Sequence, residues 1–202
     1  ARRLSLAGGG SGVPCLALEE VAPPKRQIVA SRSFGKPVTA LEDLKQAVAF
    51  HVTRAAVRLR RQGSEAGGLQ VFVATDPFAP GDPHYHGACT VEFPAPTADT
   101  RALIGRAVRG LAAIYRDGFC YKKAGVMLLS LSPADRRQGA LFDPGDGERS
   151  RQLMAALDAV NARLGRGTLW FGTEGYQQGW AMRQAHRSPA YTTRWEELPR
   201  AG

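Results

Sequence analysis

The chain has 202 residues, of which 44% are hydrophobic and 22% charged, and its 27 Lys and Arg against 18 Asp and Glu give a formal net charge of +9. This composition is typical of a globular protein, and the sequence lacks the run of about 18 uncharged apolar residues that an integral membrane protein needs. The excess of positive charge is spread along the chain and favours a polyanionic partner such as nucleic acid.

Cysteine content and the first residues indicate the cellular compartment. The three cysteines, Cys15, Cys89 and Cys120, are an odd and sparse set, which favours a reducing compartment over a disulfide framework. The chain starts at Ala1 without Met and without the apolar core of a signal peptide. We therefore expect a piece of a longer cytoplasmic protein.

The first two thirds of the chain predict one α/β unit. Residues 1–25 are interrupted by Gly and Pro and predict a tether, with 15–18 as a candidate edge strand. The elements that follow are a strand over 26–34, a helix capped by Thr39 and ended by Gly63, strands over 69–75 and 88–93, a helix from Thr97 that ends before Gly118, and a strand over 119–131. This β-α-β-β-α-β order predicts an α/β (α+β) fold, a four-stranded, mostly antiparallel sheet with two helices on one face and the other face open.

The last third predicts a linker and a small C-terminal domain. Residues 132–148 are rich in Pro, Gly and Asp, and Leu141-Phe142 is the one apolar pair within 132–147. A helix over 149–164 follows, and aromatic-rich residues 166–202 predict a compact irregular cap. The predicted apolar face of this helix consists of Leu153, Leu157, Val160 and Leu164. The predicted domains are 1–25, 26–131, 132–148 and 149–202.

Catalytic and metal-binding patterns are weak. His84, His86 and Cys89 have ligand-like spacing, but a fourth zinc ligand has no obvious source, so a solvated loop beside a small buried cysteine is the simpler interpretation. The sequence lacks a Gly-x-Ser-x-Gly motif, a P-loop and a close pair of carboxylates at a strand end. We therefore assign no catalytic residue, no metal ligand and no cofactor to this chain.

Two predicted strands carry side chains suited to phosphate. Ser31, Arg32 and Ser33 offer two hydroxyl donors around a guanidinium. Lys122 and Lys123 are adjacent, so at most one of them points away from the helices. Taken alone, both groups are better explained by a solvated sheet face or by an edge protected by charge than by contact with phosphate.

Several motifs, in order and nearly end to end, resemble the UmuC-type branch of the Y-family translesion DNA polymerases, the catalytic subunits of DNA polymerase V. The matching strings are PCLALEE at 14–20, SRSFG at 31–35, YKKAGVML at 121–128, QGALF at 138–142, GRGTL at 165–169 and SPAYTTR at 188–194. The resemblance covers only the C-terminal half of that family: the end of the thumb at 1–25, the little finger, the clamp-binding linker and the terminal domain. It implies that the palm, with its carboxylates and Mg²⁺, belongs to another part of the parent protein.

The resemblance also implies functions for particular residues. Ser31, Arg32, Ser33, Lys122 and Lys123 match strands that contact the backbone of primer–template duplex DNA. Gln138, Leu141 and Phe142 match a sliding-clamp peptide, with Gly139 where stronger versions carry Leu. The implied setting is error-prone synthesis in the bacterial SOS response to DNA damage. A processed UmuD-type dimer and a recombinase filament are implied partners to which we assign no residues.

Two other functions remain open at this point. A free-standing basic adaptor could bind RNA or protein through the same sheet, with Phe34, Phe72 and Tyr121 as the aromatic candidates for base stacking. An independent enzyme would need a pocket with convergent polar groups.

Overall fold

The computed structural model describes residues 25–135, 147–176, 178–182 and 195–198. The elements are β1 (Ile28–Val38), α1 (Leu41–Arg61), β2 (Ser64–Thr75), β3 (His86–Thr97), α2 (Thr100–Ile114), β4 (Tyr121–Pro133), α3 (Glu148–Leu164), and the short 3-10 helices η2 (Gly172–Glu174) and η3 (Trp195–Glu197). We call Ile28–Pro133 the sheet body and the described residues of 147–182 the C-terminal segment.

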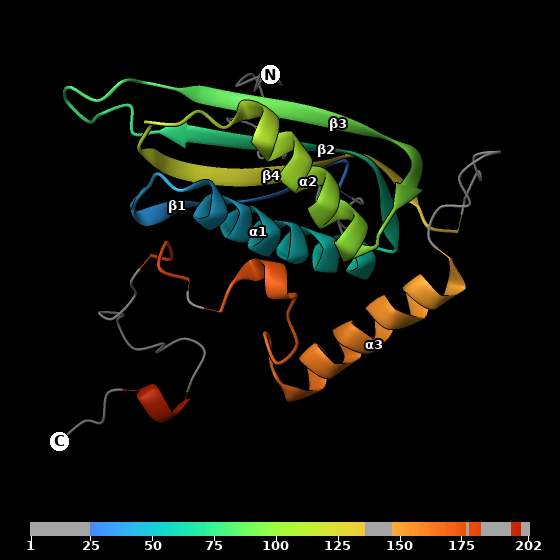
Figure 1. The fold of residues 1–202 in the computed structure, drawn as a ribbon. Helices are drawn as coiled ribbons and strands as arrows, with labels where there is room; N and C mark the ends of the chain where they lie inside the picture. Colours follow the sequence, from blue (N-terminus) through green and yellow to red (C-terminus); the bar gives the residue numbers. More distant parts are fainter. Residues whose placement is uncertain (1–24, 136–146, 177, 183–194, 199–202) are drawn as a thin grey trace, which may run out of the picture.

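The four strands form one sheet in the order β1-β4-β2-β3, and every neighbouring pair is antiparallel. Both α1 and α2 lie across the same face of this sheet (Figure 1). The predicted α/β (α+β) fold, with two helices on one face of a four-stranded sheet, is therefore confirmed.

A single apolar core lies between the sheet and its two helices. Residues at alternate positions of each strand point into it, as Leu69, Val71 and Val73 of β2 do, because side chains alternate between the faces of a strand. The helices contribute residues at three- and four-residue spacing, such as Leu44, Val48 and Val52.

Two predicted helix starts are wrong. Ala40, not Thr39, is the N-cap of α1, and it makes no side-chain cap hydrogen bond. The second helix begins at Thr100, where the side chain of Asp99 accepts a hydrogen bond from the Arg101 N–H. Strand β3 instead runs through two prolines to Thr97, which it can do because β3 is an edge strand and needs ladder hydrogen bonds on one side only.

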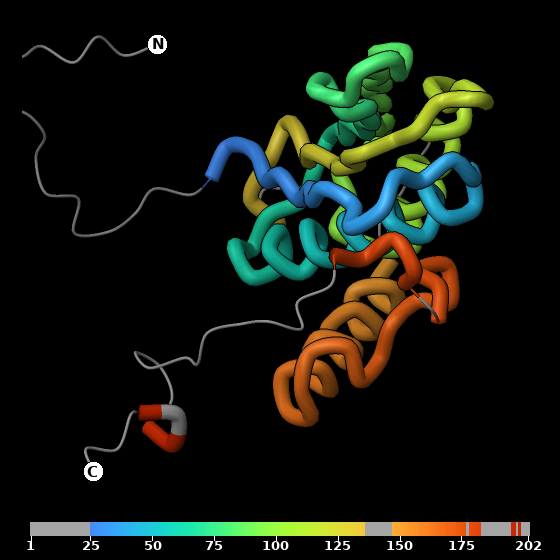
Figure 2. The backbone as a smooth tube through the Cα atoms, turned by 90° about the vertical axis from the view of Figure 1, so that its left-hand side faces the viewer, coloured from blue at the N-terminus to red at the C-terminus, as the bar shows by residue number. Residues whose placement is uncertain are grey.

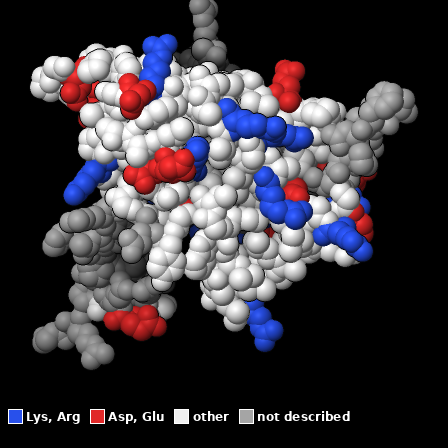
Figure 3. Space-filling model, viewed as in Figure 1, with Lys and Arg blue, Asp and Glu red and all other residues white. Residues whose placement is uncertain are grey.

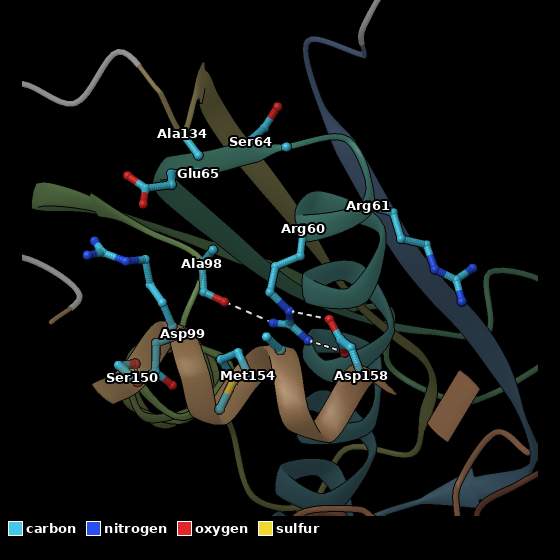
Figure 4. Close-up of a pocket in the computed structure, with 13 residues that line it drawn as sticks. Arg60, Arg61, Ser64, Glu65, Ala98, Asp99, Ala134, Ser150, Met154 and Asp158 are labelled. Carbon is cyan, nitrogen blue, oxygen red and sulfur yellow. Dashed lines mark hydrogen bonds and ion pairs between the residues drawn. The ribbon is translucent and has the colours of Figure 1, made fainter. Parts of the chain in front are cut away.

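The C-terminal segment lies against the helix side of the sheet body. Figure 2 shows its orange and red trace passing beside α1. A guanidinium–carboxylate pair joins the two, with Arg60 Nε donating to Asp158 at 2.7 Å and Nη2 donating at 2.8 Å. Arg60 also donates to the Ala98 carbonyl at 2.9 Å, so one side chain links α1, α3 and the end of β3 (Figure 4).

A cavity of about 360 Å³ lies beside this contact, between the end of α1, the start of β2 and α3 (Figure 4). The predicted apolar face of α3 is only partly correct: Leu157 and Val160 are half-buried, but Leu153 and Leu164 are exposed. Met154, which lines the cavity, is the buried residue of this helix. The helix therefore docks through a narrow contact and not through a full apolar stripe.

The described aromatic residues of the tail do not form the predicted compact cap. Trp180 is buried and packs against Phe34, Phe50 and His51 of the sheet body. By contrast, Trp170, Tyr176 and Trp195 are exposed. None of the described helices is long and apolar enough to cross a membrane.

Candidate nucleic-acid interface

The face of the sheet opposite the helices, which we call the open face, carries the outward-pointing residues of all four strands. On β2 these alternate with the core residues and include Gln70 and Phe72. Gln70 Nε2 donates a hydrogen bond to Thr90 Oγ1 of β3 at 3.0 Å, across the surface of this face. No described helix covers the open face (Figure 1).

Three of the five predicted DNA-contact residues lie on the open face. Ser33 of β1 is directly opposite Lys123 of β4, and Ser31 is opposite Gly125. A Cβ atom at Gly125 would collide with the side chains of Ser31 and Phe72, so glycine there lets three strands approach closely. Hydroxyl and ammonium donors therefore lie at the β1 side of the open face.

Lys122 occupies a bulge. On β2, Thr75 pairs with Tyr121 and Ala74 pairs with Lys123, which leaves Lys122 without a partner. The bulge lets the side chain of Tyr121 point into the core while that of Lys123 points to the open face. The two lysines therefore do not act as one pair on the same face.

Arg32 lies on the other side of the sheet. It is opposite the buried Ala124 of β4, and its exposed side chain lies at the β1 edge on the side that carries α1. Arg32 is close enough to His51 of α1 to affect its titration. Burial, then the charge of Arg54, then that of Arg32 lower the pKa of His51 to about 4. The strand Ser31-Arg32-Ser33 therefore directs its hydroxyls and its guanidinium to opposite sides.

The sequence analysis did not assign His86 to the open face. His86 of β3 pairs with Ala74, which in turn pairs with Lys123, so Ser33, Lys123, Ala74 and His86 form one row across all four strands. We call this the polar row. The signal was hidden because His86 stands in the metal-like spacing with Cys89.

That metal-like trio does not converge. His86 points to the open face, whereas Cys89, three residues along the same strand, lies on the helix side near the position of Gly110. Among the residues that the structure describes, no group of three His, Cys, Asp or Glu side chains is placed to hold a metal ion.

The predicted clamp-binding residues Gln138, Leu141 and Phe142 lie outside the described residues, as do residues 1–24 of the predicted tether. The described chain before them ends at Asp135. There the Ala134 N–H donates to the Gly63 carbonyl at 2.8 Å, so the segment leaves the body next to the turn between α1 and β2.

Comparison with known proteins gives relatives for nearly the whole chain. It is 45% identical to protein SamB of Salmonella typhimurium over 95% of this chain, 45% identical to protein UmuC of Salmonella typhimurium over 94%, and 41% identical to protein MucB of Escherichia coli over 93%. The chain spans 44–45% of the length of these relatives.

Among solved structures, the chain resembles one described as a complex of the beta-clamp processivity factor and the little finger domain of PolIV. The sequence identity is 14% and the TM-score 0.40, over 57% of this chain and 98% of that one.

Two family models match the chain in succession. Residues 151–201 match a domain of unknown function, DUF4113. Residues 25–141, which include the whole sheet body, match the impB/mucB/samB family C-terminal domain. The chain that carries the open face and the polar row therefore belongs to the impB/mucB/samB family.

Proposed function

We propose that this chain is the DNA-holding, clamp-tethered C-terminal part of an error-prone translesion DNA polymerase that acts in the SOS response. The observation that carries the proposal is the polar row on a sheet face free of described helices. Family membership supports it, because the row lies within the residues that match the family domain.

The open face suits a contact that follows any DNA sequence. Lys123 and His86 offer cationic or neutral N–H donors at two points of the row, with Ser33 beside Lys123. Such donors bind phosphate oxygens, which position a duplex without reading its bases. The middle of the face is uncharged, with Phe72, Met127 and Gly125, and the amide of Gln70 there is hydrogen-bonded to Thr90.

The tether is the second part of the proposal. Leu141 and Phe142 stand among polar residues and would each gain roughly 1.5–3 kcal/mol by burial in an apolar pocket. We propose that a sliding clamp provides this pocket and that Gln138 hydrogen-bonds its rim. A flexible tether raises the local concentration of polymerase at the primer end without fixing its orientation.

The adaptor that stacks RNA bases on aromatic rings is less well supported. Two of its three candidates, Phe34 at 1% exposure and Tyr121 at 0%, are buried in the core and unavailable for stacking. Phe72 alone lies on the open face.

The DNA contact is tested by salt-dependent binding to a labelled duplex. Lys123→Ala should lower affinity for all sequences alike and reduce the log–log salt slope by about 1. Lys45→Ala removes the same charge from α1, where Lys45 is paired with Glu42, and should leave the slope nearly unchanged. Equal slopes in the parent and Lys123→Ala, together with sequence-selective binding, contradict this part of the proposal.

The clamp contact is tested by binding to a purified bacterial sliding clamp. Leu141→Ala/Phe142→Ala should abolish clamp binding and leave melting temperature and DNA affinity nearly unchanged. Leu153→Ala/Leu164→Ala, at two exposed positions of α3, is the matched control and should bind like the parent. A large drop in melting temperature for Leu141→Ala/Phe142→Ala would show that the pair belongs to a folded core.

Catalysis, in this proposal, belongs to the other part of the parent protein, where carboxylates would hold Mg²⁺ against a nucleotide. The UmuD-type dimer and the recombinase filament are proposed partners of the parent in the bacterial cytoplasm. The purified chain should show no primer extension with Mg²⁺ or Mn²⁺. Primer extension by the highly purified chain would contradict the proposal that catalysis belongs to another part of the parent protein.

A further inference from the structure

Four exposed arginines gather on the helix side of the sheet body, away from the open face. They come from three places in the chain: Arg32 on β1, Arg54 and Arg58 on α1, and Arg166 in the turn after α3. Arg54 and Arg58 are one turn apart on α1, and a hydrogen bond from Thr53 to Glu174 at 2.9 Å holds the C-terminal segment against α1 next to Arg54. In agreement, burial and then the charges of Arg58, Arg166 and Arg32 lower the pKa of Arg54. We call this group the arginine strip.

The strip has no carboxylate partner within the described residues. The ion pairs there join other residues: Lys45–Glu42, Arg60–Asp158, Arg101–Asp99 and Arg151–Glu148. The carboxylate of η2, Glu174, is buried and accepts hydrogen bonds from Thr53 and the Phe171 N–H. Within the described residues, no ion pair joins it to an arginine of the strip.

Two of the guanidinium groups are held in place by the sheet body. Arg54 lies over the ring of Phe50, 4.9 Å from its centroid. Arg58 Nη1 donates to the Val29 carbonyl at 3.1 Å, which brings it to the same β1 edge as Arg32. These contacts reduce the entropy that the side chains would lose on binding an anion.

The position of Arg166 depends on the docked C-terminal segment. Asn161 of α3 closes the turn around it, donating from Nδ2 to the Leu169 carbonyl at 2.9 Å and accepting from the Leu169 N–H at 3.0 Å. The Arg60–Asp158 pair fixes α3 against α1. The fold thus places an arginine of the C-terminal segment beside arginines of the sheet body.

Charge is not uniformly positive on this side of the molecule. Figure 3 shows Lys and Arg interspersed with Asp and Glu and separated by wide uncharged areas.

Like charges that gather without counter-charges repel one another and are stabilised when a polyanion binds. Guanidinium groups suit phosphate oxygens in particular, because they present paired donors in a fixed geometry.

We propose that the arginine strip binds the phosphate backbone of duplex DNA. The DNA-contacting surface then continues from the open face around the β1 edge to the C-terminal segment. This inference rests on the proposed function, which supplies duplex DNA as the ligand, but the residues that carry it lie outside the polar row. Arg32, at the β1 edge, connects the two surfaces, and the contact at Arg166 exists only while α3 is docked.

The test compares two double variants of equal charge in salt-dependent binding to a labelled duplex. Arg54→Gln/Arg166→Gln removes two arginines of the strip, one from the sheet body and one from the C-terminal segment. Arg109→Gln/Arg149→Gln removes two exposed arginines from α2 and from the start of α3. The strip variant should reduce the salt slope by about 1.8, so that the affinity it loses between 50 and 200 mM salt is about 12-fold smaller than the loss in the parent. The control should keep the parental slope.

Amide hydrogen exchange of α3 first confirms that the C-terminal segment stays docked in the strip variant. Arg166→Gln alone should then reduce the slope by about 1. Equal effects of strip and control variants would overturn the proposal, as would a parental slope in the strip variant. If Lys123→Ala weakens binding while the strip variant does not, the strip fails and the open-face contact stands. If the strip variant loses affinity for single-stranded DNA but not for duplex, the assigned ligand is wrong.

Discussion

The sheet body and the C-terminal segment are stabilised in different ways. The body encloses a continuous core of fully buried side chains, among them Leu69, Leu111 and Leu128. In the described part of the C-terminal segment, the buried residues are Met154, Glu174 and Trp180, and the last two contact α1 or its neighbours.

The C-terminal segment depends on the sheet body for its order. The body buries enough apolar surface to fold independently. A segment with few buried side chains and several polar contacts instead becomes ordered when it docks. The segment's own backbone is also fitted to the body: Gly35 of β1 donates its N–H to the Trp180 carbonyl at 3.2 Å, and a Cβ atom at Gly35 would meet the Ala181 backbone. The body therefore provides the template on which the C-terminal segment is ordered.

The largest effect should come from the core of the body. Leu69→Ala should lower the free energy of unfolding by about 2–5 kcal/mol, since it removes a fully buried side chain from the central strand β2 and leaves a cavity. Chemical denaturation followed by circular dichroism measures this. Val29→Ala, on the open face with 47% exposure, is the control and should cost far less. Similar losses in the two variants would contradict the single core.

Acidification should act at the contact between the two regions. His51 is buried beside Trp180, and its pKa is about 4 in the folded state against 6.5 in an unfolded chain. A lowered pKa means that the folded state binds fewer protons, so stability is complete above pH 6.5 and falls as the pH drops toward 4. From pH 7.5 to 5 the loss should be about 2 kcal/mol.

Urea denaturation across this pH range measures the loss. His51→Gln should remove most of it, while His84→Gln, at an exposed position, should keep it. A pH dependence that is the same in the parent and His51→Gln would show that carboxylates, not His51, control acid stability.

A smaller effect is expected from the polar link. Asp158→Asn removes the charge that Arg60 contacts with two nitrogens, but Arg60 keeps its bonds to Ala98 and Thr100. We expect a loss of about 1–2 kcal/mol in docking of α3, seen as faster amide exchange in Glu148–Leu164 with little change in the body. Glu148→Gln, which breaks an exposed pair with Arg151, should change exchange far less. Equal protection of α3 in the parent and Asp158→Asn would contradict docking through this pair.

The smallest effect concerns the outer face of α3. Leu164→Ala should change stability by less than about 0.5 kcal/mol, because the side chain is 65% exposed. Thermal unfolding checks this. A loss above about 2 kcal/mol would mean that the apolar stripe predicted from the sequence is buried after all.

Local sequence patterns specify the strands and helices of the body. Alternating apolar residues in β2 and the three- and four-residue spacing in α1 are local signals, and they were sufficient for the number, type and order of strands and helices. The family resemblance came from motifs that are contiguous in the chain. Local signals are weaker at element ends. The sequence predicts helix starts at Thr39 and Thr97, whereas the N-cap of α1 is Ala40 and β3 runs to Thr97. The sequence does not show that β3 is an edge strand, which tolerates two prolines.

The residues that share a surface are set by strand pairing and helix docking. The bulge at Lys122 and the strand order set which side chains point to the open face, so His86 joined Lys123 in the polar row while Arg32 turned to the other side. For α3, periodicity predicted a stripe, but docking by Arg60 and Asp158 left its leucines at 153 and 164 exposed. The physical reason is that strand pairing and helix docking depend on residues far apart in the chain: Arg166 lies 112 positions from Arg54 (166 − 54), and the fold alone brings their charges together.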